Sequence, residues 1–190
     1  FLESGNHSDW WQKAGMKLAP ASFFYQNELN IARLNQEFLL PLVDAQNRTV
    51  SPEQVRRNNQ AITNELNHFS PYKILAKMAF PAVNKLVIKY AREQSVVDLA
   101  RVAFALERYR LAHGDYPESL EALSPHFMGK TPNDIVGGKP LIYRRTSDSQ
   151  FILYSIGWNE RDDGGVTGHY KESTVPDYTK GDLVWRYPQK

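Results

Sequence analysis

Cysteine does not occur in the 190-residue sequence, which excludes disulfide bridges, thiolate zinc sites, iron–sulfur clusters and cysteine nucleophiles. Long apolar runs are also missing: no stretch approaches the roughly 18–20 residues of a membrane span, and no signal-peptide pattern is present. An excess of one charge is missing too, because 23 lysines and arginines against 21 acidic residues leave a net charge of +2. We therefore expect no nucleic-acid partner, since binding to phosphates needs a dense basic face. A hydrophobic content of 42% nonetheless predicts a folded globular protein.

Helical patterns dominate the first half of the chain. Residues 1–20 show no periodicity, but from Ala21 apolar residues recur at steps of three and four, which predicts an amphipathic helix reaching Pro41 or Asp44. A second helix is predicted to begin at Ser51-Pro52-Glu53-Gln54. This motif places a hydroxyl at the N-cap, proline at the first helical position and glutamine three residues after the cap.

The longest periodic segment runs from Tyr72 past Pro81 to Leu111. Proline has no backbone N–H, so we expect Pro81 to start, break or kink this helix. Gly114 suits the left-handed position that ends a helix. A short helix is expected over residues 118–123, before Pro125 interrupts the chain.

Strand patterns appear only after Pro132. Residues 141–145 and 151–155 are β-rich runs separated by a short polar segment, which predicts a hairpin, and residues 182–187 predict a third strand. Helices followed by short antiparallel strands indicate an α+β fold, in which the long helix covers one face of the small sheet. We divide the chain near Ser70 into a helical N-terminal region, residues 1–71, and an α+β domain, residues 72–190.

A polar loop separates the second and third predicted strands. It contains Gly157-Trp158-Asn159-Glu160-Arg161-Asp162-Asp163-Gly164-Gly165 and ends at Gly181-Asp182. Calcium binds six to eight oxygen ligands, and glycines let backbone carbonyls turn inward, so the side chains of Asn159, Asp162, Asp163 and Asp182 are candidate calcium ligands. The spacing is not that of an EF-hand, and a solvated turn is the alternative interpretation.

Several short motifs occur in an order that resembles the soluble part of the major pseudopilins of type II secretion. They are the helix from Val97 to Tyr116-Pro117, then Ser119-Leu120-Glu121-Ala122-Leu123, the strand end Leu153-Tyr154-Ser155-Ile156-Gly157, and Gly181-Asp182-Leu183-Val184-Trp185. The resemblance covers roughly residues 82–190. It implies a long N-terminal helix on an antiparallel sheet and a structural calcium site between the last strands, at Asn159 and Asp182. The loop carries an insertion with Asp162 and Asp163, and residues 1–71 have no counterpart in the family.

The resemblance implies a non-enzymatic structural or assembly protein of an extracytoplasmic compartment, the periplasm or cell surface. Its partners would be other protein subunits, including copies of itself. The sequence begins at Phe1 rather than methionine, so we expect a fragment or processed product whose inner-membrane anchor is a segment missing from this chain. Trp10, Trp11, Phe23 and Phe24 are candidate anchors for a partner in the first half.

Two other functions remain open at this point. A metal-assisted hydrolase would use the loop of Asp162 and Asp163 around a bound water, with Arg161, His169 and Lys171 as the only local cationic groups. A carbohydrate- or peptide-binding module would instead use exposed Trp158 and Tyr170 as a platform. The five histidines form no i, i+4 pair of the kind that holds zinc on a helix.

Overall fold

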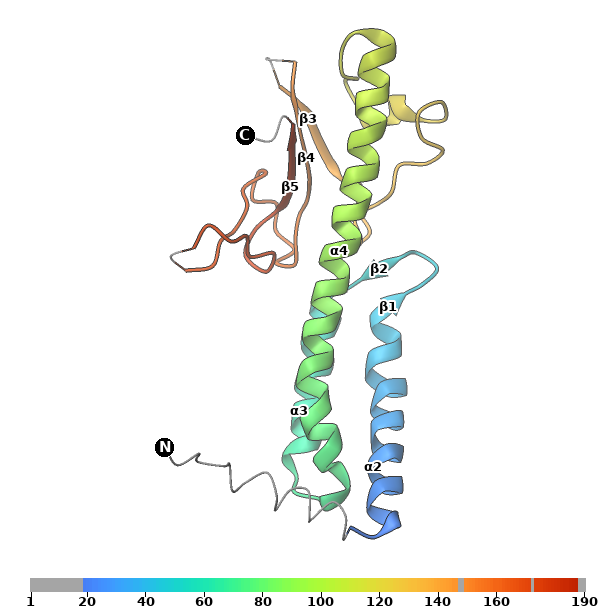
Figure 1. Ribbon diagram of the computed structural model, residues 1–190, viewed down its shortest axis with the longest axis vertical. Coiled ribbons are helices and arrows are strands. Elements are labelled where there is room, and N and C mark those ends of the chain that lie inside the picture. Colours follow the sequence, from blue (N-terminus) through green and yellow to red (C-terminus); the bar gives the residue numbers. More distant parts are fainter. Residues whose placement is uncertain (1–18, 147–148, 172, 188–190) are drawn as a thin grey trace, which may run out of the picture.

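A single long helix, α4 (Ile74–His113), forms the spine of the computed structural model, which describes residues 19–146, 149–171 and 173–187 (Figure 1). Its 40 residues continue through Pro81, so this proline neither starts nor breaks the helix, and a kink is the one predicted effect that the continuous helix allows. Gly114 ends the helix in the left-handed conformation, with φ at 87° and its N–H bonded to the Arg110 carbonyl at 2.7 Å. The predicted glycine stop is confirmed.

Helical elements of the first half flank the N-terminal part of α4 (Figure 1). In chain order they are α2 (Ala21–Leu34), the π-helical turn η1 (Asn35–Leu39), the 3₁₀ turn η2 (Leu40–Leu42), the two-residue strands β1 (Val43–Asp44) and β2 (Thr49–Val50), α3 (Pro52–Asn67) and the 3₁₀ turn η3 (Pro71–Lys73). The Ser51 side chain accepts a hydrogen bond from the Gln54 N–H, which confirms the predicted helix start. Leu34, Ile62, Leu66, Ala76 and Phe80 form a buried apolar cluster between α2, α3 and α4.

Asn27 is fully buried and ties α2 to the start of α4. Its amide nitrogen donates to the Pro71 carbonyl at 3.1 Å and to the Phe23 carbonyl at 2.9 Å, while its oxygen accepts from the Leu75 N–H at 3.0 Å. The first N–H groups of a helix have no partner within the helix, so this side chain satisfies one of them from a distant segment. A buried polar group thereby links α2 to the start of α4.

The second half is a three-stranded antiparallel sheet on the C-terminal part of α4 (Figure 1). Strands β3 (Ile142–Arg145), β4 (Phe151–Ser155) and β5 (Leu183–Tyr187) pair in that order, with Leu153 opposite Tyr143 and Trp185. The 3₁₀ turn η4 (Leu120–Leu123) replaces the short helix expected there. Leu99, Val102, Leu106, Leu123, Phe151 and Leu153 form the core between helix and sheet. The mixed α+β architecture, with a long helix and a small antiparallel sheet, is confirmed.

A third buried cluster connects the two halves at the middle of α4. It brings together Leu42, Val50, Val55, Ala91, Ile135, Val136, Trp158 and Tyr178. The Val50 N–H donates to the Ile135 carbonyl at 2.8 Å, so β2 hydrogen-bonds to the segment that precedes β3. Among the described residues, no helix combines the length and the apolarity that crossing a membrane requires.

Candidate functional site

The loop between β4 and β5 is held by close contacts between backbone segments. Gly157, with φ at 71°, turns the chain after β4, and a Cβ atom there would collide with the carbonyl oxygen of Gly181. Gly181 is equally confined, because its own Cβ would collide with the backbone nitrogen of Gly168. The Trp158 N–H donates to the Tyr178 carbonyl at 3.2 Å. Glycine is required at Gly157 and Gly181 so that the two ends of the loop can meet.

Asp182 fastens the loop to the start of β5. Its two carboxylate oxygens accept the N–H of Asp163 at 3.3 Å and the N–H of Gly165 at 2.7 Å, and its own N–H donates to the Val166 carbonyl at 2.9 Å. Only 1% of Asp182 is exposed. Because a buried carboxylate is stable only when its oxygens are bonded, this residue orders the acidic segment from inside the protein.

The other predicted ligands lie around Asp182 on the same segment. The Asn159 amide donates to the Asp163 carboxylate at 2.7 Å, and the Asn159 oxygen accepts the Arg161 N–H at 3.2 Å. Asp162 accepts the Tyr154 hydroxyl at 3.0 Å and the Gly164 N–H at 2.9 Å. All four predicted residues therefore belong to one loop, in which hydrogen bonds connect Asn159 to Asp163 and Asp163 to Asp182.

Negative charge accumulates in this loop. Burial raises the pKa of Asp182, and the charges of Asp163 and Asp162 raise it further, against the opposing effect of the two N–H donors. None of these three carboxylates makes an ion pair with a lysine, arginine or histidine in the described part of the chain. A bound cation would compensate this charge.

The donor chemistry suits a hard cation such as calcium, because every candidate ligand binds through oxygen. Asp162 and Glu160 are exposed, while Asp163 is half-buried, so the acidic segment is accessible from solvent. Within residues 19–146, 149–171 and 173–187, however, no three acidic or histidine side chains are grouped as a metal-binding cluster. Backbone carbonyls of the loop would have to provide part of a calcium shell.

Asp134 is a buried carboxylate that the sequence analysis did not single out. It accepts the Ser155 hydroxyl at 2.9 Å, the Val136 N–H at 3.0 Å and the Ile156 N–H at 3.1 Å, and so joins the segment before β3 to the end of β4. Burial raises its pKa, and the charge of Asp182 acts in the same direction. Its neighbours Val136-Gly137-Gly138 predict a turn, but nothing local indicates the bond to Ser155.

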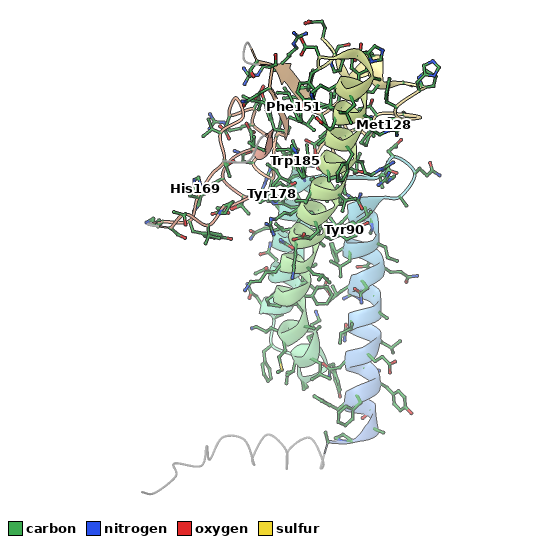
Figure 2. All side chains as sticks on the ribbon, turned by 45° about the horizontal axis from the view of Figure 1, so that its top comes forward. Tyr90, Met128, Phe151, His169, Tyr178 and Trp185 are labelled. Atoms are coloured by element: carbon green, nitrogen blue, oxygen red, sulfur yellow. The ribbon has the colours of Figure 1, made fainter. Side chains whose placement is uncertain are left out.

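The structure does not support the binding platform of Trp158 and Tyr170 that the sequence suggested. Trp158 is only 7% exposed because it packs in the cluster with Val55 and Tyr178, so it cannot form an exposed platform with Tyr170. His169 lies on the outer part of the loop, away from α4, whereas Tyr178 lies close to the helix (Figure 2). The Tyr178 hydroxyl is 3.4 Å from the Ser95 hydroxyl, and burial raises its pKa to about 12. The suggested anchors Trp10 and Trp11 lie outside the described residues.

Phe23 and Phe24, the other suggested anchors, lie on α2. Their rings meet edge to face with centroids 5.3 Å apart, and Phe24 is exposed while Phe23 is half-buried. The three cationic residues considered for a hydrolase, Arg161, His169 and Lys171, are all exposed.

Comparison with protein-family models, with curated proteins and with solved structures finds no match to this chain.

Proposed function

We propose that this protein is a non-enzymatic structural or assembly protein of the pseudopilin type, in which calcium stabilises the loop before the last strand. The observation that supports it best is the position of Asp182. This buried carboxylate fastens the acidic loop at the junction between β4 and β5, where the sequence resemblance implies a calcium site. The long helix on a three-stranded antiparallel sheet agrees with the same resemblance.

Calcium has a structural role in this proposal. Asp162, Asp163 and Asp182 would provide charge, and Asn159 and loop carbonyls would complete the shell. The ion would supply the positive charge that the loop carboxylates lack. A ligand that binds only the folded state at one hundred times its dissociation constant adds about 2.7 kcal/mol of stability. That free energy would add to the hydrogen bonds that already hold the loop.

The resemblance also supports an extracytoplasmic location and contacts with other protein subunits. In that setting bound calcium would strengthen a loop that Asp182 already fastens to β5. The protein would act by presenting a rigid surface to partners rather than by transforming a substrate.

The test is thermal unfolding of the whole chain in millimolar calcium, millimolar magnesium and chelator. We expect calcium, and not magnesium, to raise the midpoint of the wild type. Asp163→Ala and Asp182→Ala should lose this increase. Asp44→Ala is the matched control, because Asp44 caps the turn between β1 and β2 through the Asn47 N–H and lies outside the loop.

The comparison is made within each variant, between calcium and chelator, so that a variant with lower intrinsic stability still gives an answer. An equal response to calcium in the loop variants and in Asp44→Ala would place the ion elsewhere. An unchanged midpoint of the wild type in calcium would remove the ion from the proposal.

A further inference from the structure

A cleft of about 720 Å³ lies where three segments of the chain meet. Residues 46–49, from the turn between β1 and β2, line one side, and α4 contributes Asp98 and Arg101. Residues 129–133 and 137–138, from the segment before β3, complete the lining. Figure 1 shows the β1–β2 turn beside the middle of α4. Clefts of roughly 300–1,000 Å³ are the size that binds small molecules, and we call this one the junction cleft.

Positive charge exceeds negative charge in the junction cleft. Its cationic side chains are those of Arg48, Arg101 and Lys130. Asp98 is the one carboxylate that the described residues contribute to the lining, which therefore carries a net charge of +2. The remaining polar side chains are amides and hydroxyls, those of Gln46, Asn47, Thr49, Thr131 and Asn133. This lining favours an anionic ligand that accepts hydrogen bonds.

Asp98 does not neutralise the cleft, because its single carboxylate faces two guanidinium groups. Only 6% of the Asp98 side chain is exposed, and its oxygens lie 3.2 Å from Arg101 and 3.8 Å from Arg48. The shorter contact is a hydrogen bond from Nη1 of Arg101, whereas the longer one is beyond hydrogen-bond distance. Each guanidinium has five N–H donors, so most donors of both arginines remain for a ligand.

Lys130 adds charge to the same cleft. In the part of the chain that the structure describes, its ammonium group makes no ion pair. Like-charged groups that line one cleft reinforce one another and raise the local concentration of anions.

The geometry of the β1–β2 turn does not account for an arginine at position 48. Arg48 has φ at 55°, in the left-handed region, where glycine or asparagine is favoured. Its side chain is 58% exposed, so packing does not require it either. The Asp44 carboxylate accepts the N–H groups of Gln46 and Asn47, each at 3.0 Å, which orders the turn that carries Arg48. An arginine in this conformation beside a cleft indicates a role for its charge.

The junction cleft is formed by both halves of the chain. The hydrogen bond from the Val50 N–H to the Ile135 carbonyl holds the β1–β2 turn against the segment before β3. A ligand bonded to Arg48 and Lys130 would connect the same two segments a second time. Because the walls are already held together, little ordering is needed for binding.

We propose that the junction cleft binds a small oxyanion with at least two negative charges, of the class of phosphate esters and polycarboxylates. Two negative charges complement the net charge of the lining. Arginine donates paired N–H bonds to phosphate and to carboxylate oxygens, and lysine adds a point charge. The bound anion joins the two halves of the chain and stabilises the folded state. This site goes beyond the structural role proposed above and does not depend on calcium.

Isothermal titration calorimetry of the whole chain with pyrophosphate, and separately with citrate, tests the proposal. The buffer is freed of divalent metal ions, because calcium pairs with both anions. Sodium chloride keeps the ionic strength constant, because screening alone changes the attraction between charges. We expect at least one of the two anions to bind with a Kd of about 1 mM or lower. Tighter binding of pyrophosphate would assign the ligand to the phosphate esters, and tighter binding of citrate to the polycarboxylates.

Substitution of each cation locates the bound anion. Arg48→Gln, Arg101→Gln and Lys130→Gln should each weaken binding at least about tenfold. Arg92→Gln is the matched control, because Arg92 is an exposed arginine of α4 that pairs with Glu93 and does not line the cleft. It should change the Kd by less than about threefold. Equal weakening by Arg92→Gln and Arg101→Gln would overturn the site, and so would a wild type that binds neither anion.

Asp163→Ala separates this proposal from the calcium proposal. The variant lacks a carboxylate of the acidic loop, which does not contribute to the cleft, so it should bind the anion with the affinity of the wild type. Loss of anion binding in this variant would contradict the assignment to the junction cleft. A wild type that binds the anion but does not respond to calcium would contradict the calcium proposal alone.

Discussion

Asp182→Ala should be the most destabilising substitution of a carboxylate in the acidic loop when calcium is absent. The substitution removes the acceptor for the N–H groups of Asp163 and Gly165, and Gly165 is buried. Hydrogen bonds to a charged group contribute about 1.5–3 kcal/mol each. The sum is reduced because burial disfavours the charged form of Asp182, as its raised pKa indicates. We therefore expect the free energy of unfolding to fall by about 2–4 kcal/mol.

The measurement is denaturant unfolding in chelator at neutral pH, followed by circular dichroism. In a chain of this size such a loss lowers the thermal midpoint by roughly 5–15 °C. Glu160→Ala is the control, since Glu160 belongs to the same loop but is exposed and pairs with the exposed Arg56. It should cost under about 1 kcal/mol. Equal losses in the two variants would refute the claim that burial of Asp182 fastens the loop.

Two further predictions concern buried polar groups outside the loop. Asn27→Ala should lower the free energy of unfolding by about 2–4 kcal/mol, because it leaves the Leu75 N–H without its acceptor. Asn30→Ala is the control, because Asn30 lies one turn away and its hydrogen bonds are exposed. In the same denaturant titration it should cost under about 1 kcal/mol. Burial raises the pKa of Asp134, so its contribution is complete below its unfolded pKa of about 3.9 and decreases as pH rises through the folded pKa. The stability of the wild type relative to Asp134→Asn should therefore decline from about pH 4 toward neutrality, and an increase would contradict the assigned direction.

Features set by neighbouring residues were predictable from the sequence. Ser51 and Gly114 mark helix ends through local hydrogen bonds and backbone conformation, and both act as predicted. The β-rich runs at residues 141–145 and 151–155, with a polar segment between them, likewise predicted a hairpin, which β3 and β4 form. These elements follow from interactions within a few residues, which a sequence pattern records directly.

Features set by distant residues were not predictable in this way. Asn27 bonds to groups 44 and 48 residues away, and nothing in its neighbourhood indicates them. Asp134 reaches Ser155 across 21 residues. Trp158 was expected to be exposed because it stands in a polar loop, but the chain turns at Gly157 and buries it against residues of the first half. In each case tertiary contacts outweigh local composition.

The candidate site combines both kinds of information. Asn159, Asp162 and Asp163 are close in sequence, so their proximity was predictable, and the return of Asp182 followed from the antiparallel order of the strands. The structural role of Asp182 was not predictable, because its carboxylate oxygens accept backbone N–H groups inside the protein instead of facing solvent. The pattern identified residues that share one loop, but it did not show which of them holds the loop together.

The sequence of α4 has apolar residues on two sides, and periodicity alone cannot separate them. Leu99 and Leu106 satisfy the helical pattern and so do Val97 and Phe104, yet only the first pair is covered by the sheet. A helical period records that apolar residues recur, but it does not record which of two apolar faces another element will cover. The sheet covers the face of Leu99 and Leu106 and leaves Val97 and Phe104 exposed, so the buried face of α4 is decided by tertiary packing rather than by the pattern of the helix itself.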